Sequence, residues 1–129
     1  MAEQSLRDNI ARVHERIDVA KRRAGRTDTV TLVAVSKTQG AETVASAYRD
    51  GLHIFGENRV EEAGPKVAAV AELVAPLPSP QWHMIGHLQS RKATAVLPWA
   101  ALVHSVDSPK LASRLSRAVA PGQQLAVLL

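Results

Sequence analysis

Two hydrophobic patterns alternate along the 129-residue chain. Short runs of apolar and β-branched residues are typical of strands, whereas longer stretches with apolar residues three and four positions apart are typical of helices. The first pattern predicts strands at residues 30–35, 53–56, 81–85, 101–105 and 124–129. The second predicts helices at residues 3–24, 41–50, 58–74, 90–97 and 108–119.

The ends of several predicted helices carry recognisable signals. The first helix has one apolar stripe, and its last turn holds Lys21, Arg22 and Arg23, where cations favour the helix dipole. This stabilising role is favoured over nucleic-acid binding for the basic cluster. Gly25 fits the position that ends this helix. Ser108 and Pro109 fit the N-cap and first position of the last helix.

Strands that alternate with helices through short loops predict an α/β fold with a parallel sheet. Two architectures fit the pattern, a doubly wound open sheet and a (β/α)₈ barrel of the TIM type. A complete barrel takes about 250 residues, so the chain would form an incomplete barrel of about five βα units. We expect residues 1–129 to form one domain, the N-terminal portion of such a barrel. A small open sheet of five strands, complete as it stands, fits the patterning equally well.

The first predicted strand ends in a lysine. Its apolar residues do not alternate strictly with polar ones, which is typical of a fully buried strand. Lys37 would then lie at the carboxyl edge of the sheet, where α/β proteins bind their ligands. Partial desolvation there would leave some neutral amine for Schiff-base chemistry. The simpler alternative is a lysine that extends into solvent.

Polar side chains follow the other strands as well. Asn58 and Gly86 come after two successive strands, Ser105 ends the next strand, and His83 lies within one of them. In a parallel sheet these positions share one edge, which would suit a polar, anionic small molecule. Each has a structural alternative: Asn58 as a helix cap, His83 as a core histidine and Gly86 as a turn residue. A zinc site at His83 and His87 is weakly supported, and we predict no metal site.

Composition narrows the function classes. The net charge of +4 is compatible with an anionic partner, but the basic residues are dispersed and the few aromatics do not interleave with them, so we predict no nucleic-acid partner. No apolar run approaches the roughly 20 residues of a membrane span, and the polar N-terminus does not resemble a signal peptide. With no cysteine in the sequence, we predict a cytoplasmic protein with no membrane partner.

Four ordered motifs together resemble the pyridoxal phosphate homeostasis (YggS/PROSC) family. They are Leu32-Val-Ala-Val-Ser-Lys-Thr38, Phe55-Gly-Glu-Asn58 with Glu61 or Glu62, Trp82-His-Met-Ile-Gly86 with Leu88-Gln89 and Lys92, and His104-Ser-Val-Asp107. The resemblance covers essentially the whole chain but about the first half of the family's length. Arg59 and Ser90-Arg91 depart from the usual residues of the family.

This resemblance implies a barrel like the N-terminal domain of alanine racemase, with pyridoxal 5′-phosphate (PLP) held as a Schiff base on Lys37. It also implies that Asn58 and His83 line the cofactor ring, and that Gly86 and Ser105 lie on the same rim. The implied role is vitamin B6 homeostasis without catalytic turnover, with PLP-dependent apo-enzymes as possible recipients of the cofactor. The alternative is a racemase-like enzyme that depends on PLP or on the lysine. The family's phosphate-binding loops come late in the barrel, so we expect this chain to lack them. We also expect an open half-barrel to self-associate through its edges.

Overall fold

The computed structural model describes residues 2–129. Five helices and five strands follow one another along this part of the chain. The helices are α1 (Ala2–Arg23), α2 (Ala41–Arg49), α3 (Val60–Val74), the 3₁₀ helix η1 (Ser90–Val96) and α4 (Pro109–Ala118). The strands are β1 (Ala34–Val35), β2 (Ile54–Glu57), β3 (Gln81–Met84), β4 (Ala100–Val103) and β5 (Ala126–Val127).

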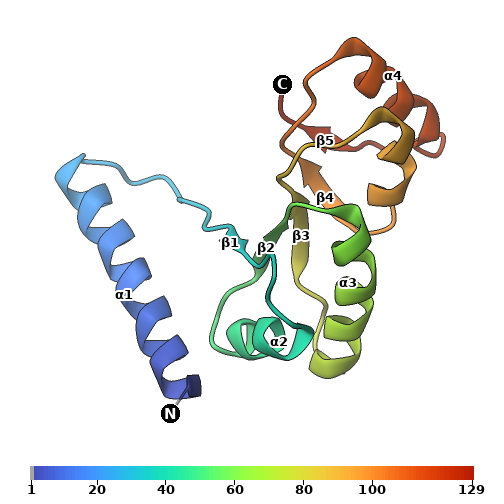
Figure 1. Ribbon diagram of the computed structural model, residues 1–129. Helices are drawn as coiled ribbons and strands as arrows, with labels where there is room; N and C mark the ends of the chain where they lie inside the picture. Colours follow the sequence, from blue (N-terminus) through green and yellow to red (C-terminus); the bar gives the residue numbers. More distant parts are fainter. Residues whose placement is uncertain (1) are drawn as a thin grey trace.

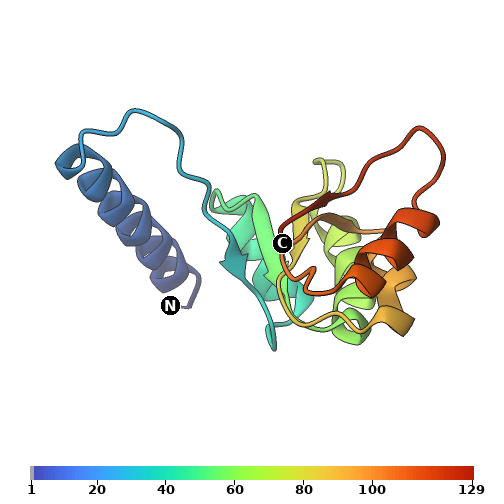
Figure 2. The same cartoon turned by 90° about the horizontal axis from the view of Figure 1, so that it is seen from above.

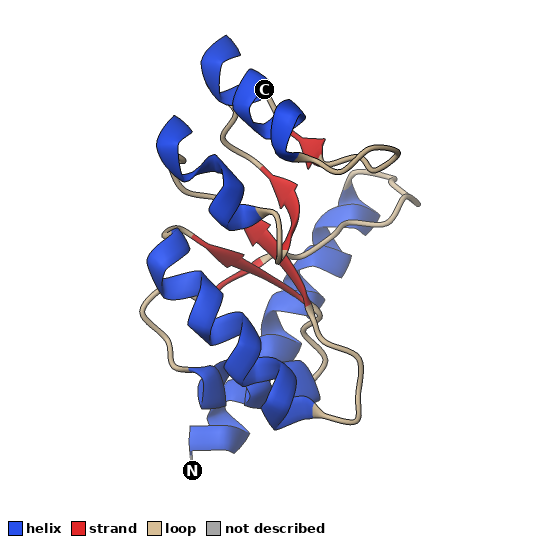
Figure 3. Cartoon of the chain, turned by 90° about the vertical axis from the view of Figure 1, so that its right-hand side faces the viewer, coloured by secondary structure: helices blue, strands red, loops and turns tan. Residues whose placement is uncertain are grey.

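The strands form one parallel sheet in the order β1-β2-β3-β4-β5. This confirms the predicted α/β class and the parallel sheet. Helices α3, η1 and α4 lie along one side of the sheet, each connecting a pair of neighbouring strands (Figures 1 and 3). All the carboxyl ends of the strands therefore point to the same edge.

Alternate residues of β2 and β3, together with Val103 of β4, pack under the helices. Phe55 and Trp82 join a cluster that includes Val44 of α2 and Val70 of α3. Met84 and Val103 join a second cluster with η1 and α4. Because side chains alternate along a strand, the residues between these positions, such as Gly56 and His83, point to the opposite face of the sheet.

The prediction of a fully buried first strand is wrong. Only Ala34 and Val35 are paired as a strand, and Val35 is 56% exposed. The physical reason is that β1 is an edge strand, hydrogen-bonded to β2 on one side only, and that Val35 is in register with Gly56 on the face that the helices do not cover. At the opposite edge β5 is also shorter than predicted, and Val127 is 39% exposed.

Helix α1 stands to one side of the sheet (Figures 1 and 2). Ile10 packs into the cluster beside α2, and Arg7 forms an ion pair with Asp50, with Nε and Oδ1 3.0 Å apart. Val13, further along the same stripe, is exposed. The helix ends as predicted at Gly25, whose φ of 65° places it in the left-handed region that glycine adopts without strain.

The starts of α4 and α3 can be compared with the caps predicted from the sequence. Ser108 caps α4 as predicted, since its Oγ accepts a hydrogen bond from the Leu111 amide at 3.1 Å and Pro109 is the first helical residue. By contrast, α3 begins two residues later than predicted, after Arg59, so the alternative of Asn58 as its N-cap is wrong. Pro65 does not interrupt α3, which is continuous to Val74.

Candidate functional site

The carboxyl edge of the sheet gathers the residues that the sequence singled out. Lys37 follows β1, Asn58 follows β2, Gly86 follows β3 and Ser105 follows β4. His83 lies within β3 itself. The parallel order of the strands is what places these positions along one edge (Figure 3).

Lys37 lies in a tight turn that leaves β1. The Gln39 amide donates a hydrogen bond to the Ser36 carbonyl at 3.1 Å, which closes the turn around Lys37 and Thr38. Thr38 has a φ of 64°, a conformation that is rare for a β-branched residue. Lys37 is exposed, so the partial desolvation expected for it is not found. Among residues 5–129, no side-chain hydrogen bond or ion pair engages its amine.

A buried ion cluster lies directly beneath this turn, formed by Ser36, Glu57, Glu62 and Lys66. Glu57 is fully buried and Lys66 is 7% exposed. The Lys66 ammonium donates to both Glu57 carboxylate oxygens, at 3.0 and 3.1 Å, and to Glu62 Oε1 at 2.9 Å. The Ser36 hydroxyl also donates to the Glu57 carboxylate. The hydrogen bond from Lys66, followed by one from the Thr38 amide, lowers the pKa of Glu62 below its usual value.

Asn58, Gly86 and Ser105 are linked through the backbone of the edge. A Cβ placed on Gly86 would come within 2.3 Å of the Asn58 carbonyl oxygen. Only glycine permits so close an approach, which is a different reason from the turn conformation suggested by the sequence. The Ser105 hydroxyl donates a hydrogen bond to the Gly86 carbonyl at 2.6 Å. Ser105 thus supports the segment that in turn supports Asn58.

His83 forms a close pair with His104, which belongs to the fourth motif but is not among the predicted site residues. The Nδ1 atom of His83 lies 3.0 Å from Nε2 of His104, so one ring donates a proton and the other accepts it. Burial, and secondarily the proximity of His104, lowers the pKa of His83 below its usual value. The pair lies on the face of the sheet that the helices do not cover. His83 is therefore both a hydrogen-bonded, largely buried histidine and part of a polar patch on that face.

His87 does not join His83. Its Nδ1 atom instead lies 3.4 Å from Asp107 Oδ2, and both side chains are exposed. Within residues 2–129, no group of three or more His, Cys, Asp or Glu side chains is arranged to hold a metal ion. No helix in this part of the chain is long and apolar enough to cross a membrane.

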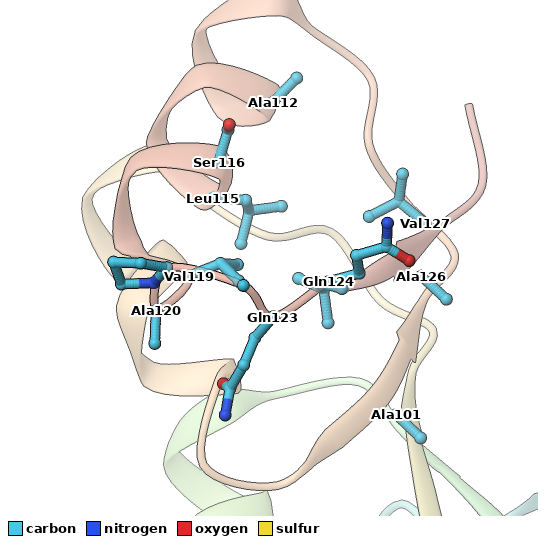
Figure 4. Close-up of a pocket in the computed structure, with 13 residues that line it drawn as sticks. Ala101, Ala112, Leu115, Ser116, Val119, Ala120, Gln123, Gln124, Ala126 and Val127 are labelled. Atoms are coloured by element: carbon cyan, nitrogen blue, oxygen red, sulfur yellow. The ribbon is translucent and has the colours of Figure 1, made fainter.

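A hollow in the surface lies away from these residues. It is a groove of about 800 Å³ between α4, the turn at Pro121–Gln124 and β5. Leu115, Val119, Gln123 and Gln124 are among the side chains that line it (Figure 4). The lining contains no ionisable side chain and none of the predicted site residues. The groove therefore provides no acid, base or nucleophilic amine, and the candidate functional residues lie at the carboxyl edge.

Two sets of contacts near the edge were not predicted from the sequence, for different reasons. Lys66 occupies the core-facing stripe of α3, between the buried residues Ala63 and Val70. A charge on such a stripe signals a buried ion pair, and the sequence contains that signal. His104 belongs to the fourth motif, but its contact with His83 carries no comparable signal, because that contact depends on the register between β3 and β4.

Comparison with known proteins confirms the resemblance indicated by the four motifs. No model of a known protein family matches the chain. A curated protein of Pseudomonas aeruginosa, named pyridoxal phosphate homeostasis protein, is 46% identical over 113 residues, which are 87% of this chain and 47% of that protein. The chain thus spans about half the length of the curated relatives it matches.

Two solved structures are also similar to this chain. A protein of unknown function from Bifidobacterium adolescentis is 35% identical with a TM-score of 0.81, over 98% of this chain and 55% of that one. PipY of Synechococcus elongatus, solved with PLP bound, is 39% identical with a TM-score of 0.60, over 78% of this chain and 45% of that one.

Proposed function

We propose that this chain, a relative of proteins named pyridoxal phosphate homeostasis protein, binds PLP through Lys37. The observation that carries the proposal is the exposed amine of Lys37, without a hydrogen-bond partner among residues 5–129, at the carboxyl edge of a parallel sheet. The similarity to a PLP-bound structure at 39% identity supports the choice of ligand.

The residues at this edge fit the chemistry of the cofactor. When bound, PLP supplies an aldehyde that condenses with a neutral primary amine, with the loss of one water molecule. Lys37 supplies a primary amine at this edge. We propose that Asn58 and His83 line the cofactor ring, and that Gly86 and Ser105 hold the rim in place. The net charge of +4 favours a phosphorylated ligand.

We further propose that the sheet is part of a (β/α)₈ barrel, like the N-terminal domain of alanine racemase, and that residues 1–129 form one domain. The sequential strand order supports this, because doubly wound sheets reverse their order at a switch point. The helices on one face and polar His83 on the other also suit a barrel wall. A barrel needs about 250 residues, roughly twice the length of this chain.

The physiological role we propose is to bind the cofactor and keep reactive aldehyde at low free concentration, for delivery to PLP-dependent apo-enzymes. The naming of the relatives supports a role in homeostasis without catalytic turnover. Cytoplasmic location and the absence of a nucleic-acid partner stay predictions. Racemisation of alanine by the purified chain would argue instead for the enzymatic alternative.

Visible absorbance tests the proposal directly. The purified chain is titrated with PLP beside Lys37→Ala and, as a matched control, Lys110→Ala, which removes an exposed lysine from α4. We expect a new absorbance band in the unchanged chain and the control, and its loss in Lys37→Ala. Borohydride reduction followed by peptide mass spectrometry should locate the added mass on Lys37. A folded chain that gives no band, or a label on other lysines only, would refute the proposal.

A further inference from the structure

The turn that carries Lys37 is anchored on both sides of that residue. On one side, the Ser36 amide donates to the Gly56 carbonyl at 3.0 Å, and the Ser36 carbonyl accepts from the Lys66 ammonium at 2.8 Å. On the other side, the Thr38 amide donates to Glu62 Oε1 at 2.6 Å. Lys37 itself makes no such contact among residues 5–129, so its backbone position is set by its two neighbours.

Lys66 is the group that joins the two anchors. Its ammonium has three protons, and they are directed to the Ser36 carbonyl, Glu57 and Glu62. Glu62 Oε1 is the same atom that accepts the Thr38 amide proton. With its donors fully used and its side chain 6% exposed, Lys66 has no capacity left to bind a ligand itself.

Stability alone does not account for the buried ion cluster. Burying charges costs a desolvation penalty that their attraction often only balances, and apolar residues of similar volume usually pack as well. An apolar side chain at position 66 would lose the hydrogen bonds to the Ser36 carbonyl and to Glu62. The turn needs these hydrogen bonds, because Thr38 is held at a φ of 64° that an unrestrained threonine avoids.

We propose that Lys66 is a positioning residue, whose ammonium links Ser36, Glu57 and Glu62 and thereby holds the turn that presents Lys37. Lys66 does not touch the ligand. It acts through the backbone on either side of Lys37, so that the amine is presented from one fixed position. This inference rests on the proposed function of Lys37 as the amine that captures PLP.

Three variants test the proposal. Lys66→Met keeps the length of the side chain and removes the charge, whereas Glu62→Gln alters the partly exposed end of the cluster and serves if Lys66→Met does not fold. Lys92→Met is the matched control. Lys92, in η1, forms an ion pair with Glu61, which lies on α3 next to Glu62, but Lys92 does not contact the Lys37 turn. Urea unfolding establishes that each variant is folded.

Two readouts are followed in each folded variant. The first, hydrogen exchange of the Thr38 amide, does not involve PLP. We expect it to accelerate about tenfold or more in Lys66→Met and Glu62→Gln, as expected for the loss of a charge-assisted hydrogen bond. The second is the Kd of PLP at Lys37, which we expect to rise by about the same factor. Lys92→Met should change neither.

The outcomes separate this inference from the proposed function. Unchanged exchange at Thr38, or faster exchange with an unchanged Kd, would overturn the role of Lys66. If the unchanged chain binds no PLP, the proposed function fails, and the exchange data alone decide whether Lys66 holds the turn. Equal effects in Lys92→Met would also overturn the proposal, because they would show a general response to the loss of any lysine.

Discussion

Gly86 lies so close to Asn58 that a single methyl group at its Cα would meet the Asn58 backbone. The added carbon would come within 2.3 Å of the carbonyl oxygen and 2.7 Å of the Cα atom. Both contacts are with backbone, which has less freedom to move aside than the end of a side chain. The position of Asn58 at the sheet edge therefore depends on the absence of a side chain at residue 86.

Gly86→Ala should displace Asn58 and destabilise the chain. Overpacking of this kind costs about 1–3 kcal/mol, and urea unfolding measures the loss. Gly64→Ala is the matched control, because a Cβ there meets no atom within 4 Å and the residue lies inside α3. We expect the control to gain about 0.5–1 kcal/mol from improved helix propensity. A Gly86→Ala chain as stable as the unchanged one would contradict this packing argument.

The His83–His104 pair predicts a loss of stability in mild acid. Because burial lowers the pKa of His83 below 6.5, the unfolded chain binds a proton more readily than the folded chain. Stability due to this residue is complete above the unfolded pKa and decreases as the pH falls through 6.5 toward the lower folded value. Urea unfolding between about pH 7.5 and 5.5 should show this decrease.

His83→Gln should flatten this pH dependence, since it removes the titrating ring. His53→Gln removes an exposed histidine and should leave the dependence unchanged. The chosen pH range lies above the range in which Glu62 takes up a proton. The lowered pKa of Glu62 contributes stability that is lost only as the pH falls below 4.5. Identical pH profiles for His83→Gln and the unchanged chain would show that His83 does not govern the response.

The sequence predicts most of the fold because its signals are local. The cap at Ser108, the stop at Gly25 and the apolar runs of β2 and β3 depend on neighbouring residues. The burial of β1 could not be predicted in the same way, since it depends on how many strands flank it. Its two-residue length and the exposure of Val35 follow from its place at the edge of the sheet.

The same distinction between local signals and long-range contacts applies to the candidate site. Lys37, Asn58, Gly86 and Ser105 could be placed at one edge from strand order alone, because parallel strands align their carboxyl ends. The partner of His83 required the register of β3 against β4. The proposed role of Lys66 depends on contacts with Ser36 and Glu57, which lie on other elements and have no fixed spacing in the sequence. Only its contact with Glu62, four residues earlier on α3, has a spacing that the sequence shows.

Exposed apolar residues on β1 and β5 predict self-association. Val35 and Val127 lie on the two edge strands, whose free backbone groups can pair with another chain. Sedimentation at micromolar concentration should detect species larger than a monomer, and Val35→Lys should reduce them. Leu77→Lys places the same charge on an exposed loop residue and should not. A compact monomer in the unchanged chain would contradict the prediction.

Thr38→Gly should stabilise the chain and weaken its capture of PLP. The left-handed conformation of Thr38 costs about 1–2 kcal/mol for an L-residue, and glycine avoids this cost. Part of the gain is offset by the greater freedom of glycine in the unfolded chain, so we expect an increase of about 0.5–1 kcal/mol in the free energy of unfolding. Thr43→Gly, on the exposed face of α2, should instead lose about that amount. If the strain at Thr38 serves to fix Lys37, the relaxed turn should bind PLP less tightly despite its higher stability. A Thr38→Gly chain that is both more stable and equally able to bind would show that the conformation of Thr38 has no part in presenting the lysine.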